Sequence, residues 1–188
     1  MKTILFAIVL SSLAFLSNAY MMITGSAAVT APESVKELVF PVAGKRSNIG
    51  SFWGDTRDGG KRKHKGIDIF AKKGTPVVAV TDGIIVSSGN TPRGGKHLWL
   101  QSMHHPWKAY YAHLDQQKAK PGQIVKKGDV IGTVGNTGNA KYTPSHLHFG
   151  IYKWWSGAVD PLPLVKNSPK ISLPQTTPKA GSQIANKK

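Results

Sequence analysis

Histidine is the residue type in this chain with the clearest potential for chemistry, and four of its seven copies fall in three short segments. The first segment has a histidine four positions before an aspartate, the second a histidine after an aromatic run, and the third two histidines one residue apart. In chain order these residues are His64 with Asp68, then His113, then His146 with His148. The chain contains no cysteine, so a metal site would have to use histidine, aspartate or glutamate.

The third segment has the most specific spacing. In a β-strand, residues two apart point to the same face, so His146 and His148 are expected to project together. Leu147 and Phe149 then pack on the opposite side. Two neighbouring imidazoles repel each other when both are protonated, and this favours a functional site over a pair of solvated strand histidines.

His64 and Asp68 flank Gly66, and the apolar run that follows favours a strand preceded by a bend rather than a helix. In a fully extended strand the two side chains would lie about 13 Å apart, at ~3.3 Å per residue. They can bind one metal only if the chain curls back near Gly66, and glycine permits such conformations. Taken alone this pair is a weak signal, and His113 alone is more typical of a structural histidine.

The three segments together are far more specific, because His-x-x-x-Asp, Tyr-Ala-His-Leu and His-Leu-His-Phe occur in that order. They resemble the motifs of the lysostaphin-type, LytM-like zinc metalloendopeptidases of the bacterial cell wall. The likeness covers roughly residues 38–165 and includes further segments at 74–77, 79–83, 125–132, 135–138 and 159–161. No motif residue is missing, whereas some relatives of that family have lost ligands and act only as activators or binding modules.

The resemblance implies that His64, Asp68 and His148 bind Zn²⁺ and that His113 and His146 form a catalytic pair beside it. Two histidines and one carboxylate suit zinc independently, and they leave a fourth position for a water whose pKa the metal lowers to about 7. Hydrolysis also needs a base, and later an acid for the leaving amine. The only glutamates, Glu33 and Glu37, precede the domain, so histidine is the natural proton carrier. Which of the two histidines removes the proton stays open.

The elements that must position these groups are short β-rich runs bounded by Gly, Pro, Asn and Asp. They cover residues 66–70, 76–80, 83–87, 97–103, 108–114, 130–134 and 146–152, with a hairpin loop at 104–107. No stretch of this region sustains a helical apolar period with caps. We therefore expect an all-β domain over 38–165, an antiparallel, sandwich-like sheet with long loops around a zinc cleft.

The first residues predict export. Lys2 precedes an apolar run over 4–16, and Ser17-Asn18-Ala19 fits a small-x-small cleavage site, so 1–19 is expected to be a signal peptide and 20–37 a linker. The bulk of the chain would then be periplasmic or secreted. The alternative is an uncleaved membrane anchor, because residues 20–23 extend the apolar run toward the length of about 20 that spans a bilayer.

The chain carries 25 Lys and Arg against 9 Asp and Glu, a formal net charge of +16, which predicts an anionic partner. For an exported protein, anionic envelope polymers are nearer than nucleic acid, which we do not expect as a partner. Residues 166–188 are rich in Lys, Pro, Ser and Thr and predict a disordered basic tail. The segment 125–132 also resembles turns of biotinyl and lipoyl carriers, but their modifiable Met-Lys hairpin is absent. No obligate protein partner is evident.

Two groups of residues near the motifs have two interpretations each. The basic group consists of Lys61, Arg62, Lys63 and Lys65. It could attract wall carboxylates or form a solvated loop. The aromatic group consists of Trp107, Tyr142, Trp154 and Trp155. It could flank a substrate groove or pack in the core. The histidines that match no ligand position are expected to be structural, with the last of them near the cleft: His97, His104 and His105.

The expected function is zinc-dependent hydrolysis of peptide cross-links in bacterial peptidoglycan. The alternative is a non-catalytic module of the same fold that binds peptidoglycan or activates an amidase. D-Ala to diaminopimelate cross-links and glycine-rich bridges both stay open as the bond cleaved.

Overall fold

In a computed structural model that describes residues 37–172, nearly all regular elements of the protein are antiparallel β-strands, joined by turns and loops. The strands of its main sheet run in the order β1-β4-β11-β8-β7-β6-β9, and β5, β10 and β12 join this path from the side. Their bounds are β1 Ser47–Ser51, β4 Ile67–Ala71, β5 Pro76–Val78, β6 Gly83–Thr91, β7 Gly95–Ser102, β8 Trp107–Gln117, β9 Ile124–Val125, β10 Val130–Val134, β11 His146–Lys153 and β12 Gly157–Val159. The smaller elements are β2 Thr56–Arg57, β3 Arg62–Lys63, η1 Asp58–Gly60, η2 Gly138–Ala140 and α3 Leu162–Val165.

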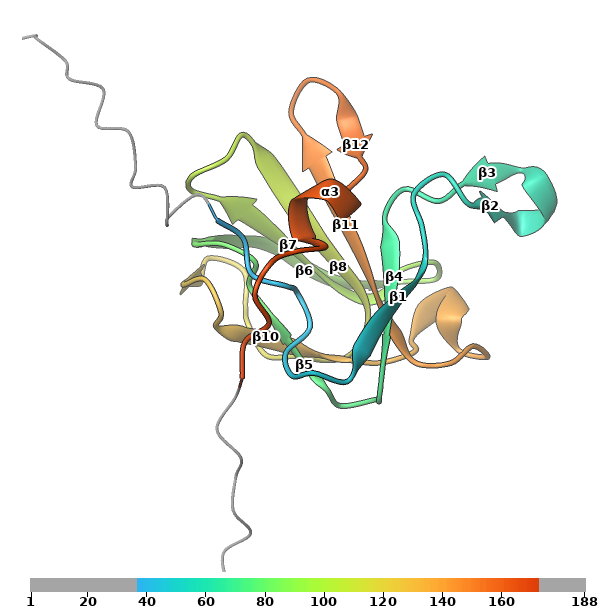
Figure 1. The fold of residues 1–188 in the computed structure, drawn as a ribbon, viewed down its shortest axis with the longest axis horizontal. Coiled ribbons are helices and arrows are strands. Elements are labelled where there is room, and N and C mark those ends of the chain that lie inside the picture. The colour runs from blue at the N-terminus through green and yellow to red at the C-terminus, as the bar shows by residue number, and fades with distance from the viewer. Residues whose placement is uncertain (1–36, 173–188) are drawn as a thin grey trace, which may run out of the picture. The chain divides into compact units, whose positions relative to one another are not determined.

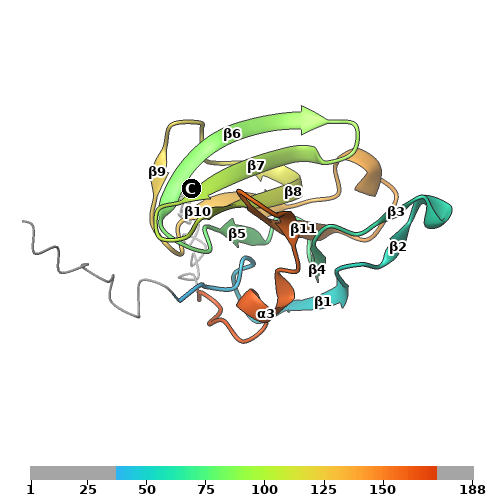
Figure 2. The same ribbon diagram turned by 90° about the horizontal axis from the view of Figure 1, so that it is seen from above.

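The sheet turns back over itself to enclose the core. Strand β10 pairs with β5 on one side and with β8 on the other. In Figure 2 the long strands β6, β7 and β8 arch over β5, and Figure 1 shows β1 and β4 running beside β11. The interior is apolar, with Ile67, Leu98, Tyr111 and Phe149 fully buried. The prediction of an all-β, antiparallel, sandwich-like domain is confirmed.

Each of the seven strands expected from the sequence is present, as β4, β5, β6, β7, β8, β10 and β11. The loop expected at 104–107 connects β7 to β8, with its last residue already in β8. Strands β1, β9 and β12 were not expected. Strand β1 has the sequence Ser-Asn-Ile-Gly-Ser, which lacks an apolar alternation, and it forms because β4 supplies a pairing partner.

The C-terminal boundary differs from the expectation. Residues 166–172 follow α3 and pack on the domain: the Phe40 amide donates to the carbonyl of Pro169 (2.9 Å), and the Gly44 amide donates to that of Ile171 (2.9 Å). Ile171 also packs against the small apolar cluster around Val39. A disordered tail from 166 onward is therefore wrong for 166–172.

The predicted signal peptide over 1–19, the predicted linker up to residue 36 and residues 173–188 of the predicted basic tail lie outside the described residues. Within 37–172, no helix has the length and apolar character needed to cross a bilayer.

Candidate metal centre and cleft

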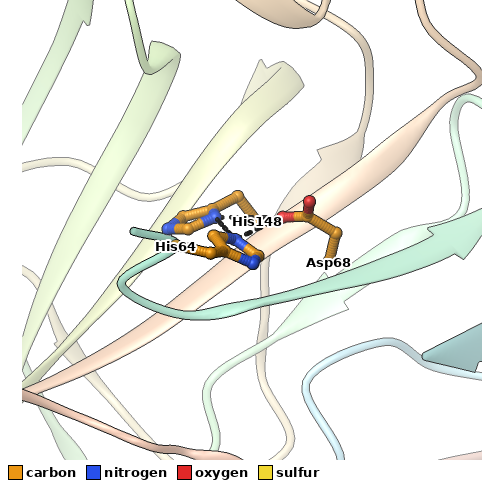
Figure 3. Close-up of side chains that lie close together, drawn as sticks. All are labelled: His64, Asp68 and His148. Atoms are coloured by element: carbon orange, nitrogen blue, oxygen red, sulfur yellow. Dashed lines mark hydrogen bonds and ion pairs between the residues drawn. The ribbon is translucent and has the colours of Figure 1, made fainter. Parts of the chain in front are cut away.

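Three side chains from two distant segments of the sequence, His64 and Asp68 from one and His148 from the other, meet at one point (Figure 3). His148 Nδ1 lies 3.0 Å from Asp68 Oδ1, His64 Nε2 lies 3.1 Å from the same oxygen, and the two nitrogens are 2.9 Å apart. A tetrahedral zinc site with bonds of ~2.0–2.1 Å separates its ligand atoms by about 3.3 Å. The three atoms are thus spaced as the ligands of a single ion, and among the described residues no other such group of three occurs.

Strand register accounts for two of the three groups. Pairing of β4 with β11 places Asp68 directly opposite His148. His64 reaches both because the chain bends at Gly66, just before β4, while the His64 amide is held by the carbonyl of Asp55 (2.8 Å). This turn replaces the separation of about 13 Å that an extended strand would impose.

Gly66 is needed in this turn because nothing larger fits. A Cβ atom there would lie 2.5 Å from the carbonyl oxygen of Phe149 and 2.7 Å from Cε1 of His148. Gly66 does not have a positive φ. The predicted curl is confirmed, but it depends on close approach to β11 rather than on a left-handed backbone.

A second set of contacts orients the candidate ligands. His64 Nδ1 lies 2.8 Å from the Phe52 carbonyl oxygen. The carbonyl can only accept, so this shorter contact favours a proton on Nδ1, with the Nε2 lone pair turned to the cluster, although Nη2 of Arg57, which can only donate, lies 3.0 Å from the same Nδ1. The guanidinium of Arg57 donates to Asp68 Oδ2 (2.7 Å) and to the Ser51 hydroxyl. Arg57 was missed by the sequence reasoning, since no motif spacing links it to His64 or Asp68.

The electrostatics of the cluster suit a cation. Burial opposes ionisation of Asp68, but the hydrogen bond from His148 and the close approach of His64 outweigh it and hold the pKa of the carboxyl far below its usual range. Burial lowers the pKa of His148, although Asp68 opposes that effect. Near neutral pH the cluster therefore contains a carboxylate and at least one neutral imidazole, the forms that bind metal.

His113 and His146 lie beside this cluster as a second pair. Their ring centroids are 5.0 Å apart, and His113 is 5.9 Å from His148 by the same measure. His113 Nδ1 donates to the Thr137 carbonyl (2.9 Å), and His146 Nδ1 donates to that of Pro144 (2.9 Å). Each imidazole thus keeps Nε2 free to accept a proton.

His113 has a left-handed backbone, with φ of 61°, which is uncommon for a residue other than glycine. Its amide donates to the Gly94 carbonyl (2.8 Å) in the β6–β7 hairpin, and this bond helps to hold the conformation. Burial, together with the neighbouring His146 and His148, lowers the pKa of His113 to about 4. The ring is consequently neutral at physiological pH.

Both groups line one cleft of about 1030 Å³, which is at the upper end for small-molecule sites and has room for a peptide segment. Trp99, Tyr110 and Tyr152 form part of its wall, with Trp99 4.5 Å from Tyr110 and 4.9 Å from Tyr152 between ring centroids. The sequence reasoning missed these three. Tyr152 could have been recognised from the sequence, because it lies four residues after His148 in the same predicted strand and therefore points to the same face.

The aromatic residues singled out from the sequence do not belong to the cleft wall. Trp107 is buried in the core and stacks on His105, whereas Tyr142, Trp154 and Trp155 are exposed. His105 is likewise absent from the lining, which corrects the expectation that it lies near the cleft. Of the basic group, all members except Lys61 line it: Arg62, Lys63 and Lys65.

A β domain that gathers two imidazoles and a carboxylate around one point, with two more imidazoles beside them, has the site of a metal-dependent hydrolase. Residues 62–161 match the description "Peptidase family M23", and the chain belongs to this family.

Among curated proteins, the chain is similar to the L-Ala–D-Glu endopeptidase of Bacillus subtilis (strain 168), with 40% identity over 111 residues. That match covers 55% of this chain and 34% of the relative. It is also similar to the murein hydrolase activator NlpD of Salmonella dublin, 37% identical over 99 residues, which are 53% of this chain and 25% of the relative. The chain thus spans only about a third or a quarter of each of these proteins.

Two solved structures share the fold. The catalytic domain of lysostaphin from Staphylococcus simulans superposes with a TM-score of 0.57 at 35% identity, covering 62% of this chain and 90% of that one. A zinc-containing peptidase from Vibrio cholerae gives a TM-score of 0.57 at 30% identity, covering 64% of this chain and 37% of that one.

Proposed function

We propose that the protein is a zinc-dependent endopeptidase that hydrolyses peptide cross-links of bacterial peptidoglycan. The observation that carries the proposal is one cleft that holds three converging ligand atoms and two imidazoles with free Nε2 atoms. Membership of peptidase family M23 supports the same reaction type. The names of two relatives, the L-Ala–D-Glu endopeptidase of Bacillus subtilis and the murein hydrolase activator of Salmonella dublin, support the cell-wall substrate.

In this proposal His64, Asp68 and His148 hold Zn²⁺. The donor set fits, because it offers two imidazole nitrogens and a carboxylate oxygen with near-tetrahedral spacing in their deprotonated forms. When bound, zinc acidifies a water molecule and polarises a carbonyl group. The Phe52 carbonyl and the Arg57 guanidinium keep His64 and Asp68 in the orientation that the ion requires.

His113 and His146 are proposed to carry the proton. Each ring is fixed by a hydrogen bond from Nδ1 to a backbone carbonyl, so only Nε2 exchanges protons with the cleft. One of them accepts a proton from the attacking water, and the leaving amine must later receive one. Once protonated, that imidazole can return the proton from Nε2 to the leaving amine, and the second ring lies 5.0 Å from it between centroids.

The site of action is proposed to be outside the cytoplasm. The N-terminal charge and apolar run support export, as does similarity to a protein whose name refers to murein, the Salmonella activator NlpD. The overall positive charge is consistent with attraction to anionic envelope polymers.

The proposal is tested with purified protein and purified sacculi. We expect a zinc content near one per chain and release of muropeptides by the loaded protein. Chelation should abolish this release, and added zinc should restore it. Zinc-loaded protein that binds sacculi without cutting them would instead support an activator or binding module, for which the similarity to NlpD gives a specific reason.

A further inference from the structure

The basic residues of the cleft differ in whether another group neutralises them. The lining contains five of them, Arg57, Arg62, Lys63, Lys65 and Arg93. Only two acidic side chains, Asp58 and Asp68, lie in the same lining, and both are already paired with arginine. Lys63 donates to the Thr56 hydroxyl (3.1 Å). Both acidic side chains of the cleft are therefore already paired, whereas part of its positive charge has no acidic partner.

Lys65 and Arg93 are the two basic side chains of the cleft lining that have no partner among the described residues. Both are exposed, and neither side chain makes a hydrogen bond or ion pair with any residue of the described part of the chain. Lys65 stands between His64 and Gly66, in the turn that completes the metal cluster. Lys65 therefore contributes a cation to the cleft lining at the residue next to a candidate ligand.

Arg93 belongs to the other side of the cleft, in the β6–β7 hairpin. Its own carbonyl accepts from the Asn139 amide (3.2 Å), and the carbonyl of the next residue, Gly94, accepts from the His113 amide (2.8 Å). The hairpin is thereby anchored to η2 and to the proposed proton carrier. Free positive charge consequently lies on both sides of the candidate catalytic groups.

We propose that the cleft selects peptides that carry a free carboxylate next to the scissile bond, as diaminopimelate-type cross-links do, over uncharged glycine bridges. This inference rests on the proposed function. A carboxylate pairs with a guanidinium or ammonium group in a charge-assisted hydrogen bond. A glycine bridge would remove water from Lys65 and Arg93 without supplying an opposite charge, and such uncompensated desolvation disfavours the wrong substrate.

The test uses the full-length zinc-loaded protein and two synthetic cross-linked peptides. The peptides are identical except that the residue next to the scissile bond has a free carboxylate in one and a carboxamide in the other. We expect kcat/KM to be about tenfold or more higher for the acid, the size of a charge-assisted hydrogen bond. Arg93→Gln and Lys65→Gln should each bring the acid-to-amide ratio closer to one. Lys118→Gln, an exposed lysine outside the cleft lining, should leave the ratio unchanged.

The outcomes separate this inference from the function on which it rests. Equal kcat/KM for acid and amide, or faster cleavage of a pentaglycine-bridged peptide, would overturn the carboxylate selection and leave the endopeptidase in place. An unchanged ratio in both Gln variants would also overturn it. Cleavage of none of these peptides by protein that contains zinc would overturn the endopeptidase function itself, and the inference with it.

Discussion

The guanidinium of Arg57 donates a 2.7 Å hydrogen bond to Oδ2 of Asp68, and this leaves Oδ1 as the oxygen that faces His64 and His148. The two carboxylate oxygens therefore have separate partners. In the proposed zinc site Asp68 would therefore bind the ion through Oδ1 alone, with Oδ2 kept away from the metal position by Arg57. This contact gives Arg57 a positioning role that the motif residues alone do not reveal.

Replacing Arg57 with glutamine is expected to weaken zinc binding by about 10- to 100-fold, the usual effect of removing a group that orients a ligand. Competition with a chromogenic chelator measures this affinity. Arg46→Gln, an exposed arginine outside the cleft lining, is the matched control and should bind zinc as the parent does. Arg57→Lys should recover only part of the loss, because an ammonium group cannot reproduce the planar guanidinium contacts. Parental affinity in Arg57→Gln would contradict the positioning role.

Substitutions of the candidate ligands and of the candidate proton carriers are expected to differ in their effect on bound zinc. His148→Ala and Asp68→Ala should lose both bound zinc and activity. His146→Ala should keep about one zinc per chain but lose about 10²- to 10⁴-fold in kcat, the range for a general acid-base group. Elemental analysis and cleavage of a fluorogenic peptide provide the two measurements. Full activity in His148→Ala would end the ligand assignment.

Gly66→Ala is expected to damage the metal centre through its backbone. The added methyl group would meet the Phe149 carbonyl at 2.5 Å and must push β11 away, at a cost of about 1–3 kcal/mol in the free energy of unfolding. Zinc affinity should fall as well, because His148 moves with the strand. Gly44→Ala is the control: its Cβ would meet nothing within 4 Å, and it should cost about 1 kcal/mol from its positive φ while zinc binding stays intact. Equal zinc affinity in both variants would refute this account.

His113 predicts a pH dependence of stability. Its pKa is lowered to about 4 in the folded protein, from 6.5 in the unfolded chain, so the unfolded state binds more protons between these values. Stability is then fully present above pH 6.5 and falls as the pH drops toward 4. At 1.36 kcal/mol per unit, the loss from this residue between pH 7.5 and 5 is about 2 kcal/mol.

Urea unfolding of metal-free protein at these two pH values tests the expectation. His113→Gln should lose about 2 kcal/mol less than the parent over the same interval, because the titrating group is gone. Identical losses in parent and variant would show that His113 does not carry the effect.

The strands were predictable where apolar residues and punctuating glycines coincide, as in residues 146–152, and the motif spacing indicated all five candidate histidine and aspartate positions. The contacts that join distant segments were not predictable. Arg57 meets Asp68 only after the chain turns back before β4. Trp99, Tyr110 and Tyr152 come together only through the register of β7, β8 and β11. Single-sequence patterns report which face a residue takes, but not which neighbour lies across the strand.

The β6–β7 hairpin couples two properties that a designer would like to vary independently. It carries Arg93 into the cleft, and through the Gly94 carbonyl it also fixes the backbone of His113. The hairpin has no room for a larger residue two positions after Arg93, because a Cβ atom at Gly95 would lie 2.2 Å from the Thr137 hydroxyl oxygen. Replacing this hairpin with a foreign one, to change the proposed substrate preference, would therefore displace His113, the proposed proton carrier, unless Gly94 and Gly95 were kept.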